Sequence, residues 1–250
     1  MDEKNAAFRE VVDSVARVLA DARHDRDGSF ISTPVLYPGG SIVVVRIDEH
    51  VDGRYLVTDM GLGFQESDLM GASHTFARVA PEVSARFGVR FDQHAFFLDV
   101  RREQLAGAVS VIAACSQEAV QHTAFKLAER KRADAADRLY DRLAEVFAAT
   151  NVERGAEVLG ASNTPWHVTA LVTADGHRAA FEPVSDHHSS IASTVVKFVD
   201  LSQLDNPPAR IAVVRSKEKL GTRLSLITTV GSVVEESVSS QTLERLARAA

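Results

Sequence analysis

The chain has 250 residues, of which 45% are hydrophobic and 25% are charged, and its formal net charge at pH 7 is -6. This composition is ordinary for a globular protein, and the length suits one large domain or two of common size. The negative net charge excludes an overall basic field that would attract nucleic acid or an acidic membrane surface, although a local basic stripe remains open.

The sequence also bears on the compartment. Cys115 is the only cysteine, which excludes an internal disulfide and fits a reducing cytosol. Its apolar helical surroundings predict a buried, unreactive thiol. The acidic start of the chain lacks a basic-then-apolar signal pattern, and no apolar run approaches the roughly 20 residues that a membrane span requires. We therefore expect a soluble cytoplasmic protein.

The first predicted element is an amphipathic helix over residues 5–22. A break over residues 24–29 follows it, and three strands are expected over residues 30–37, 41–49 and 53–59. Glycine-containing turns join these strands, which favours a small antiparallel meander. The apolar side chains of the helix recur at helical spacing: Phe8, Val11, Val12, Val15, Val18 and Leu19.

The meander ends in Asp59, just before a turn that contains Gly61 and Gly63. A carboxylate beside a glycine-relaxed turn can form a ligand-binding loop, as in a small-molecule sensor. The alternative is that Asp59 accepts backbone N–H bonds and caps the turn or the helix that follows. The sequence favours this structural role.

A helical stretch is predicted over residues 73–87, with Pro81 marking a break between two short helices. After it, alternating apolar residues predict a hairpin over residues 89–100 that turns at Asp92 and Gln93.

The segments ISTPVLYPGGSIVVVRI and GRYLVTDMG, a helical segment and then VRF and FFLDV resemble the bacterial and phage family called domain of unknown function 1828. The matching positions are Thr33, Pro34, Asp59 and Gly61, and the resemblance covers roughly residues 25–120. Met60 departs from the smaller or polar residue expected there. Members are often found on mobile elements and are frequently followed by a second domain. The resemblance thus implies a role in phage–host or plasmid–host conflict, but no biochemical activity.

A long helix is predicted over residues 101–150. Its middle, AERKRADAADR, is charged with mixed sign, and a helix that is polar all round at its centre usually bridges two bodies through solvent. We therefore predict an N-terminal α+β domain over residues 1–120 and a C-terminal α/β domain over residues 121–250, led by the bridging helix.

The second domain is predicted to hold a central sheet. Its expected strands cover residues 157–159, 166–173, 178–184 and 210–215. Asp175-Gly176 is a strong hairpin signal between the second and third of them. A helix over residues 189–204, with Ser185 or Asp186 as N-cap, precedes the last strand, which should be buried on both faces. The predicted class is α+β overall, and the second domain has the element order of the PD-(D/E)xK nuclease core.

Metal-dependent nucleases of that topology need two acidic groups to hold magnesium and a lysine beside them. Glu182 could be one ligand, but Val184 stands where the lysine is required. Asp175 lies in the hairpin turn, and Lys197 would have to reach the site from the helix. A divergent Mg²⁺-dependent nuclease using Glu182, Asp175 and Lys197 is therefore the alternative hypothesis.

Two further clusters carry weaker signals. Asp186-His187-His188 fits an exposed helix-capping loop better than a metal site, because adjacent histidines on a helix do not face one ion. After the buried strand over residues 210–215, the segment SKEKLG is predicted to turn the chain into a hairpin that continues through TRLSLITTV and GSVVEESV, and a helix follows from about Ser240. The basic tip of this hairpin is the best candidate for a phosphate contact: Lys217, Lys219 and Arg223.

The favoured hypothesis is a non-catalytic binding or regulatory protein without a metal or other cofactor. It would act on a protein or nucleic-acid partner and not on a membrane, and homodimer formation stays open.

Overall fold

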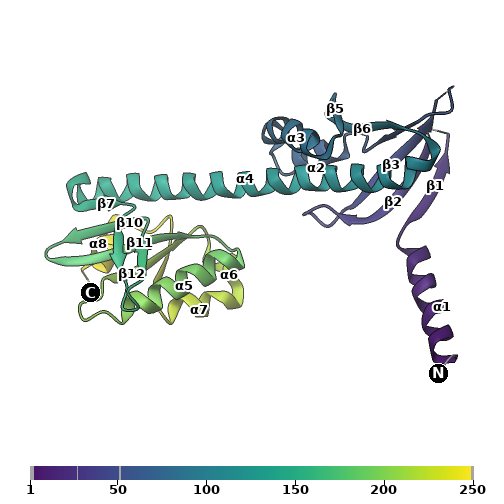
Figure 1. Ribbon diagram of the computed structural model, residues 1–250. Coiled ribbons are helices and arrows are strands. Elements are labelled where there is room, and N and C mark those ends of the chain that lie inside the picture. The colour runs from purple at the N-terminus through teal and green to yellow at the C-terminus, as the bar shows by residue number, and fades with distance from the viewer. Residues whose placement is uncertain (1–2, 27, 51, 249–250) are drawn as a thin grey trace. The chain divides into compact units, whose positions relative to one another are not determined.

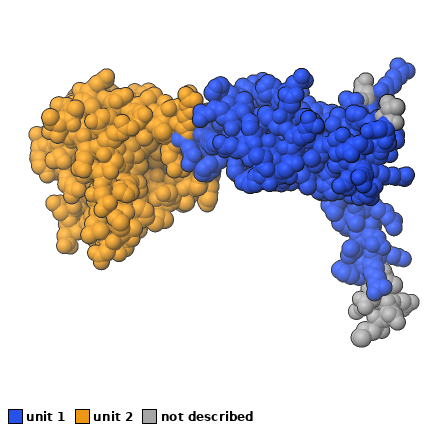
Figure 2. Space-filling model, turned by 45° about the horizontal axis from the view of Figure 1, so that its top comes forward, with its two compact units in different colours: residues 1–129 blue, residues 130–250 orange. Residues whose placement is uncertain are grey.

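The computed structural model describes residues 3–26, 28–50 and 52–248. The chain divides into two compact units, residues 1–129 and 130–250, and the division falls inside the long helix α4, Leu105–Phe147 (Figures 1 and 2). The sequence analysis placed this division between residues 120 and 121. The α+β class is confirmed, with an antiparallel sheet in the first unit and a mixed sheet in the second.

The first unit contains a six-stranded antiparallel sheet in the order β1-β2-β3-β4-β6-β5. The predicted meander and the hairpin formed by β5 and β6 are confirmed, but the hairpin turns at Gln93 and His94, which both have positive φ, one residue later than the predicted turn at Asp92 and Gln93. Strand β1 was missed, since residues 21–22 were assigned to the helix and residues 24–29 to a break. Both faces of β1 are exposed, so it carries no alternation of apolar residues. The strands are β1 Asp21–Asp25, β2 Gly28–Leu36, β3 Ile42–Glu49, β4 Tyr55–Thr58, β5 Arg90–Asp92 and β6 Ala95–Val100.

Three helices accompany this sheet: α1 Glu3–Val18, α2 Leu62–Leu69 and α3 Ser73–Phe87. Helix α2 was not predicted. The break expected at Pro81 was wrong, because α3 runs through the proline without interruption. Phe76, Val79 and Val83 are buried on one face of α3, and this packing outweighs the backbone hydrogen bond that proline cannot donate.

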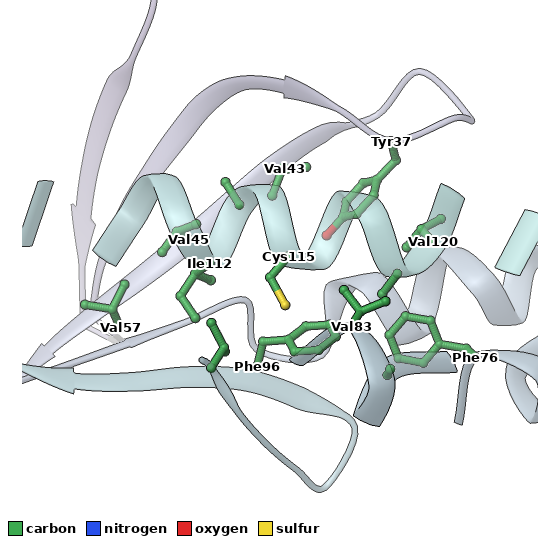
Figure 3. Packing of buried hydrophobic residues seen from close by; sticks show 14 of the residues in the cluster. Tyr37, Val43, Val45, Val57, Phe76, Val83, Phe96, Ile112, Cys115 and Val120 are labelled. Atoms are coloured by element: carbon green, nitrogen blue, oxygen red, sulfur yellow. The ribbon is translucent and has the colours of Figure 1, made fainter. Parts of the chain in front are cut away.

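The core of the first unit lies between the sheet, α3 and the first half of α4 (Figure 3). Ile112, Cys115 and Val120 of α4 are fully or almost fully buried there. Burial raises the pKa of the Cys115 thiol to about 12, so the prediction of a buried thiol is confirmed.

The second unit contains a five-stranded sheet in the order β13-β12-β11-β10-β7. Strands β7, β10 and β11 run antiparallel, whereas β11, β12 and β13 run parallel. The Asp175-Gly176 hairpin is confirmed, with φ of 53° and 83°. The strand predicted over residues 166–173 is in fact two strands, because β9 leaves the main sheet and pairs with β8. The strands are β7 Val152–Arg154, β8 Glu157–Leu159, β9 Pro165–His167, β10 Ala170–Ala174, β11 His177–Val184, β12 Ala209–Val214 and β13 Ser232–Glu235.

The helices of this unit are the second half of α4, α5 His188–Ser202, α6 Lys217–Leu220, α7 Leu224–Thr228 and α8 Ser240–Ala247. The N-cap of α5 is His187 rather than Ser185 or Asp186. The hairpin predicted after β12, with its turn at SKEKLG, was also wrong: the chain forms α6 and α7 there and then β13, which is parallel to β12. Leu220 of α6 and Ile227 of α7 are buried in the same cluster, and the apolar residues Leu224, Leu226 and Ile227 resembled the alternation of a strand in the sequence.

Across the described ranges, no helix combines the length and apolar character that crossing a bilayer would require.

Candidate functional site

A buried ion pair joins β11 to α5 in the second unit. The Lys197 ammonium donates to Glu182 Oε1 at 2.6 Å and to the carbonyl oxygen of His167 at 2.5 Å. The two side chains are only 13% and 10% exposed. Helix α5 connects β11 to its parallel neighbour β12, so the pair fixes this crossover against the sheet.

Thr169 completes the coordination of Glu182. Its backbone N–H donates to Oε1 at 3.1 Å, and its hydroxyl donates to Oε2 at 2.9 Å. Ala170 faces Phe181 across β10 and β11, so Thr169 lies opposite Glu182, where the second acid of a metal-binding pair would have to stand. A hydroxyl and an ammonium thus surround this carboxylate, and both of its oxygens are engaged.

Asp175 lies at the other end of β11, in the turn that precedes it, and forms a salt bridge with Arg248 at 2.8 Å. Five strand positions separate His177 from Glu182, which corresponds to roughly 16 Å along the strand. The structure therefore brings Glu182 and Lys197 together but not Asp175. Among the described residues, no group of three His, Cys, Asp or Glu side chains is placed to hold a metal ion, and the histidines His177, His187 and His188 form no such group.

Asp200, one helical turn after Lys197 on α5, connects the β8–β9 hairpin to the helix through hydrogen bonds. It accepts hydrogen bonds from Trp166 Nε1 at 2.6 Å and from the Ser162 N–H and hydroxyl at 2.8 and 2.7 Å. The Trp166 bond is the main cause of the lowered pKa of Asp200. A Cβ at Gly160 would overlap the Asp200 carboxylate. The sequence does not indicate this contact, because no local pattern links residues 34 positions apart.

The carboxylate of Asp59 is completely buried and accepts four hydrogen bonds. The donors are the N–H groups of Gly61, Gly63 and Phe96 and the hydroxyl of Ser116, at 2.7–3.3 Å. Burial is the largest cause of its raised pKa.

Tyr37 extends this network through a 2.8 Å hydrogen bond to the Ser116 hydroxyl, and burial raises the pKa of its phenol. A Cβ at Gly63 would lie 2.6 Å from Ser116 Oγ, so the glycine allows the turn to approach α4. The residues of the expected ligand loop, Asp59, Gly61 and Gly63, thus lie together, but their polar groups point into the protein and form hydrogen bonds with one another.

An open groove of about 700 Å³ runs along β13, the last strand of its sheet. Lys217 and Arg245 line it, and neither forms a salt bridge with any residue in the described part of the chain. We call it the β13 groove, and its lining also includes Val233, Val234, Glu235, Ser237, Val238, Thr242 and Leu246.

The structure separates the three predicted phosphate contacts. Lys217 lines the β13 groove, but Lys219 does not. Arg223 donates instead to the carbonyl oxygen of Asp186 at 2.6 Å. Arg245 was missed as a groove residue, because it arrives from α8, whose docking position no local sequence pattern specifies.

Comparisons of the chain with protein-family models, with curated proteins and with solved structures found no match.

Proposed function

We propose that the protein acts by binding a partner macromolecule and not by catalysis, in the mobile-element or phage-defence context that the resemblance over residues 25–120 implies. The observation that carries this proposal is the closed site at Glu182. The Lys197 ammonium occupies the position beside this carboxylate that a divalent cation would need, and Thr169 replaces a second acid. Removing a paired ion from a buried site is costly, which supports a structural role for the pair.

The β13 groove is the surface that we assign to the partner. The Glu236 N–H donates to Val214 on β12, and alternation along the strand then directs the amides of Val233 and Glu235 outward. An extended peptide can add to such a free edge through main-chain hydrogen bonds. Val238 and Leu246 in the lining, together with the cations Lys217 and Arg245, favour a peptide with alternating apolar and acidic side chains, and the acidic Glu235 in the lining already accepts from the backbone N–H of Lys217. A nucleic-acid partner would require a longer basic stripe than these two cations provide.

Selection from a phage-displayed library of random dodecapeptides tests this assignment. We expect enriched peptides to alternate apolar and acidic residues, and to bind Lys217→Glu or Arg245→Glu protein at least about tenfold more weakly, since reversing one charge in an acidic contact costs more than about 1.4 kcal/mol. Lys219→Glu is the matched control, because Lys219 is also exposed but does not line the groove. Equal binding to all three variants would remove the groove from the proposal.

The second candidate is a divergent Mg²⁺-dependent nuclease. The burial of Glu182 beside Lys197, within a sheet of the expected element order, is the observation that favours it. Incubating the protein with plasmid and linear DNA, with and without Mg²⁺ or Mn²⁺, separates the two candidates. We expect no metal-dependent cutting. Cutting that Glu182→Ala abolishes would overturn the binding proposal.

A further inference from the structure

Helix α1 presents an apolar stripe that no part of its own unit covers. Its side chains are all at least 48% exposed, and that of Val18 is 80% exposed. Single helices of this length are marginally stable in water without a packed apolar face. The stripe therefore requires a covering surface. We call Phe8, Val11, Val12, Val15, Val18 and Leu19 the α1 stripe.

The sheet of the same unit has a matching uncovered face. Val45 and Val57 point into the core, so Val44 and Leu56, their neighbours along the strands, point to the opposite side. Phe97 shares that side, because it pairs with Thr58. None of the apolar residues on this side belongs to the core cluster; Leu36 and Ile42 are 53% and 52% exposed, and the others are half-buried. We call Phe30, Leu36, Ile42, Val44, Leu56 and Phe97 the outer face.

We propose that two copies of this chain form a dimer in which the α1 stripe of each copy packs on the outer face of the other. Only Leu19 and Ala20 separate α1 from β1, the edge strand, and α1 extends away from the sheet of its own copy (Figure 1). In this dimer the contact between stripe and outer face occurs twice, related by the twofold axis, and it covers both apolar surfaces of each copy.

The dimensions of the two surfaces agree. The twelve-residue stripe is about 18 Å long, and the strands β2, β3, β4 and β6 together are roughly 14 Å wide between their axes. Each helix would lose on the order of 600 Å² of accessible surface in the dimer, and each sheet would lose a comparable area. The whole interface would therefore bury about 2,000 Å² or more. This area reaches the range of stable protein interfaces.

The charges favour a second copy over a membrane surface. The side of α1 opposite the stripe carries Arg9, Glu10, Asp13 and Arg17, two of each sign. An interfacial helix for an anionic bilayer would instead be rich in lysine and arginine. On the outer face, Arg46 and Asp48 pair with each other at 2.9 Å, and the guanidinium of Arg90 lies over the ring of Phe97.

Sedimentation equilibrium measures the stoichiometry. We expect a dimer for the unmodified chain, and at least a tenfold larger dissociation constant for Val15→Asp on the stripe and for Val44→Asp on the outer face. Ala16→Asp adds the same charge one position away, outside the stripe, and should leave the dissociation constant within about twofold. A monomeric unmodified chain at about 100 μM, or a dimer that Val15→Asp and Val44→Asp leave intact, would overturn the proposal.

A disulfide experiment identifies which surfaces meet. Val15→Cys protein and Val44→Cys protein are mixed and oxidised, and we expect disulfides chiefly between the two different variants. Disulfides only between copies of Val15→Cys would show helix-to-helix pairing and contradict the exchange. Efficient intrachain bridging in the Val15→Cys, Val44→Cys double variant, with no interchain product, would show that α1 covers its own sheet and would also contradict it. Neither outcome bears on the β13 groove, which lies in the other unit.

Discussion

Asp59 and Asp200 show how one carboxylate can fix a turn of the chain in each unit. Asp59 accepts hydrogen bonds from backbone N–H groups at the start of α2 and on β6, whereas Asp200 accepts hydrogen bonds from Trp166 and Ser162. Sequence analysis named the first of these roles, because an aspartate before glycines is a recognisable turn signal. It missed the second, because the partners of Asp200 are distant in sequence.

Replacing Asp59 by asparagine should lower the free energy of unfolding by about 1–3 kcal/mol, because an amide nitrogen cannot accept the hydrogen bond of a backbone N–H. Urea unfolding at pH 7 measures this loss. Ser116→Ala removes only one donor of the network and should cost less. Equal stability of Asp59→Asn and the unmodified chain would contradict a structural role.

The raised pKa of Asp59 also predicts a pH dependence of stability. Between the ordinary aspartate pKa near 4 and the raised value, the folded protein holds a proton that the unfolded chain has released. The contribution of Asp59 to the free energy of unfolding should thus fall as pH rises through that window and stay constant above it. Asp59→Asn should lack this contribution when unfolding is followed from about pH 4 to pH 8. Parallel curves for the two proteins would refute the assignment.

A methyl group at Gly160 should disrupt the bond between Asp200 and Trp166, because the new Cβ would overlap the Asp200 carboxylate. Trp166 is the only tryptophan, so we expect the emission of Gly160→Ala to shift to longer wavelength as the indole becomes solvated. Gly107→Ala is the control: no atom lies within 4 Å of its Cβ position, and alanine should stabilise α4 by about 0.5–1 kcal/mol. An unchanged spectrum for Gly160→Ala would rule out a rigid contact.

At the scale of elements, alternation and turn chemistry predicted the meander, both two-residue hairpins and the long helix. The same reasoning failed where tertiary packing decides. Residues 224–228 are helical and bury Ile227 in one cluster with Ile191 and Phe198 of α5, and β1 is a strand only because β2 pairs with it. The proximity of Glu182 and Lys197 was proposed from topology, but the role of Thr169 as their third partner depends on strand register, which the sequence does not display.

The crossover between β11 and α5 should depend on both members of its ion pair. Lys197→Met or Glu182→Gln alone should lower the free energy of unfolding by about 3 kcal/mol, since each leaves a buried polar group without its partner. The double variant Glu182→Gln, Lys197→Met should lose less than the sum of the single losses, which urea unfolding can measure. Strictly additive losses would mean that the pair is not coupled.

For the whole molecule, the sequence predicted two bodies and a charged helix between them. The exposed stretch from Ala128 to Asp134 contains Arg130, Lys131 and Arg132. We expect limited trypsin digestion to cut there first and to release fragments that keep their cores, because each unit buries its own apolar cluster. Circular dichroism of the separated fragments should show cooperative melting. Fragments that melt without a transition would contradict independent folding.

The strand order of the second sheet has a consequence for synthesis on the ribosome. All the partners of the first core precede Lys126, so that body can close while the remainder of the chain is still being translated. The second sheet receives its outer strand from residues 232–235 and its covering helix from residues 240–247, which are translated long after the last residue of the first core. A nascent chain released before residues 232–235 are translated would therefore keep a folded first unit and expose the unpaired edge of β12. Chaperones and proteases recognise surfaces of this kind.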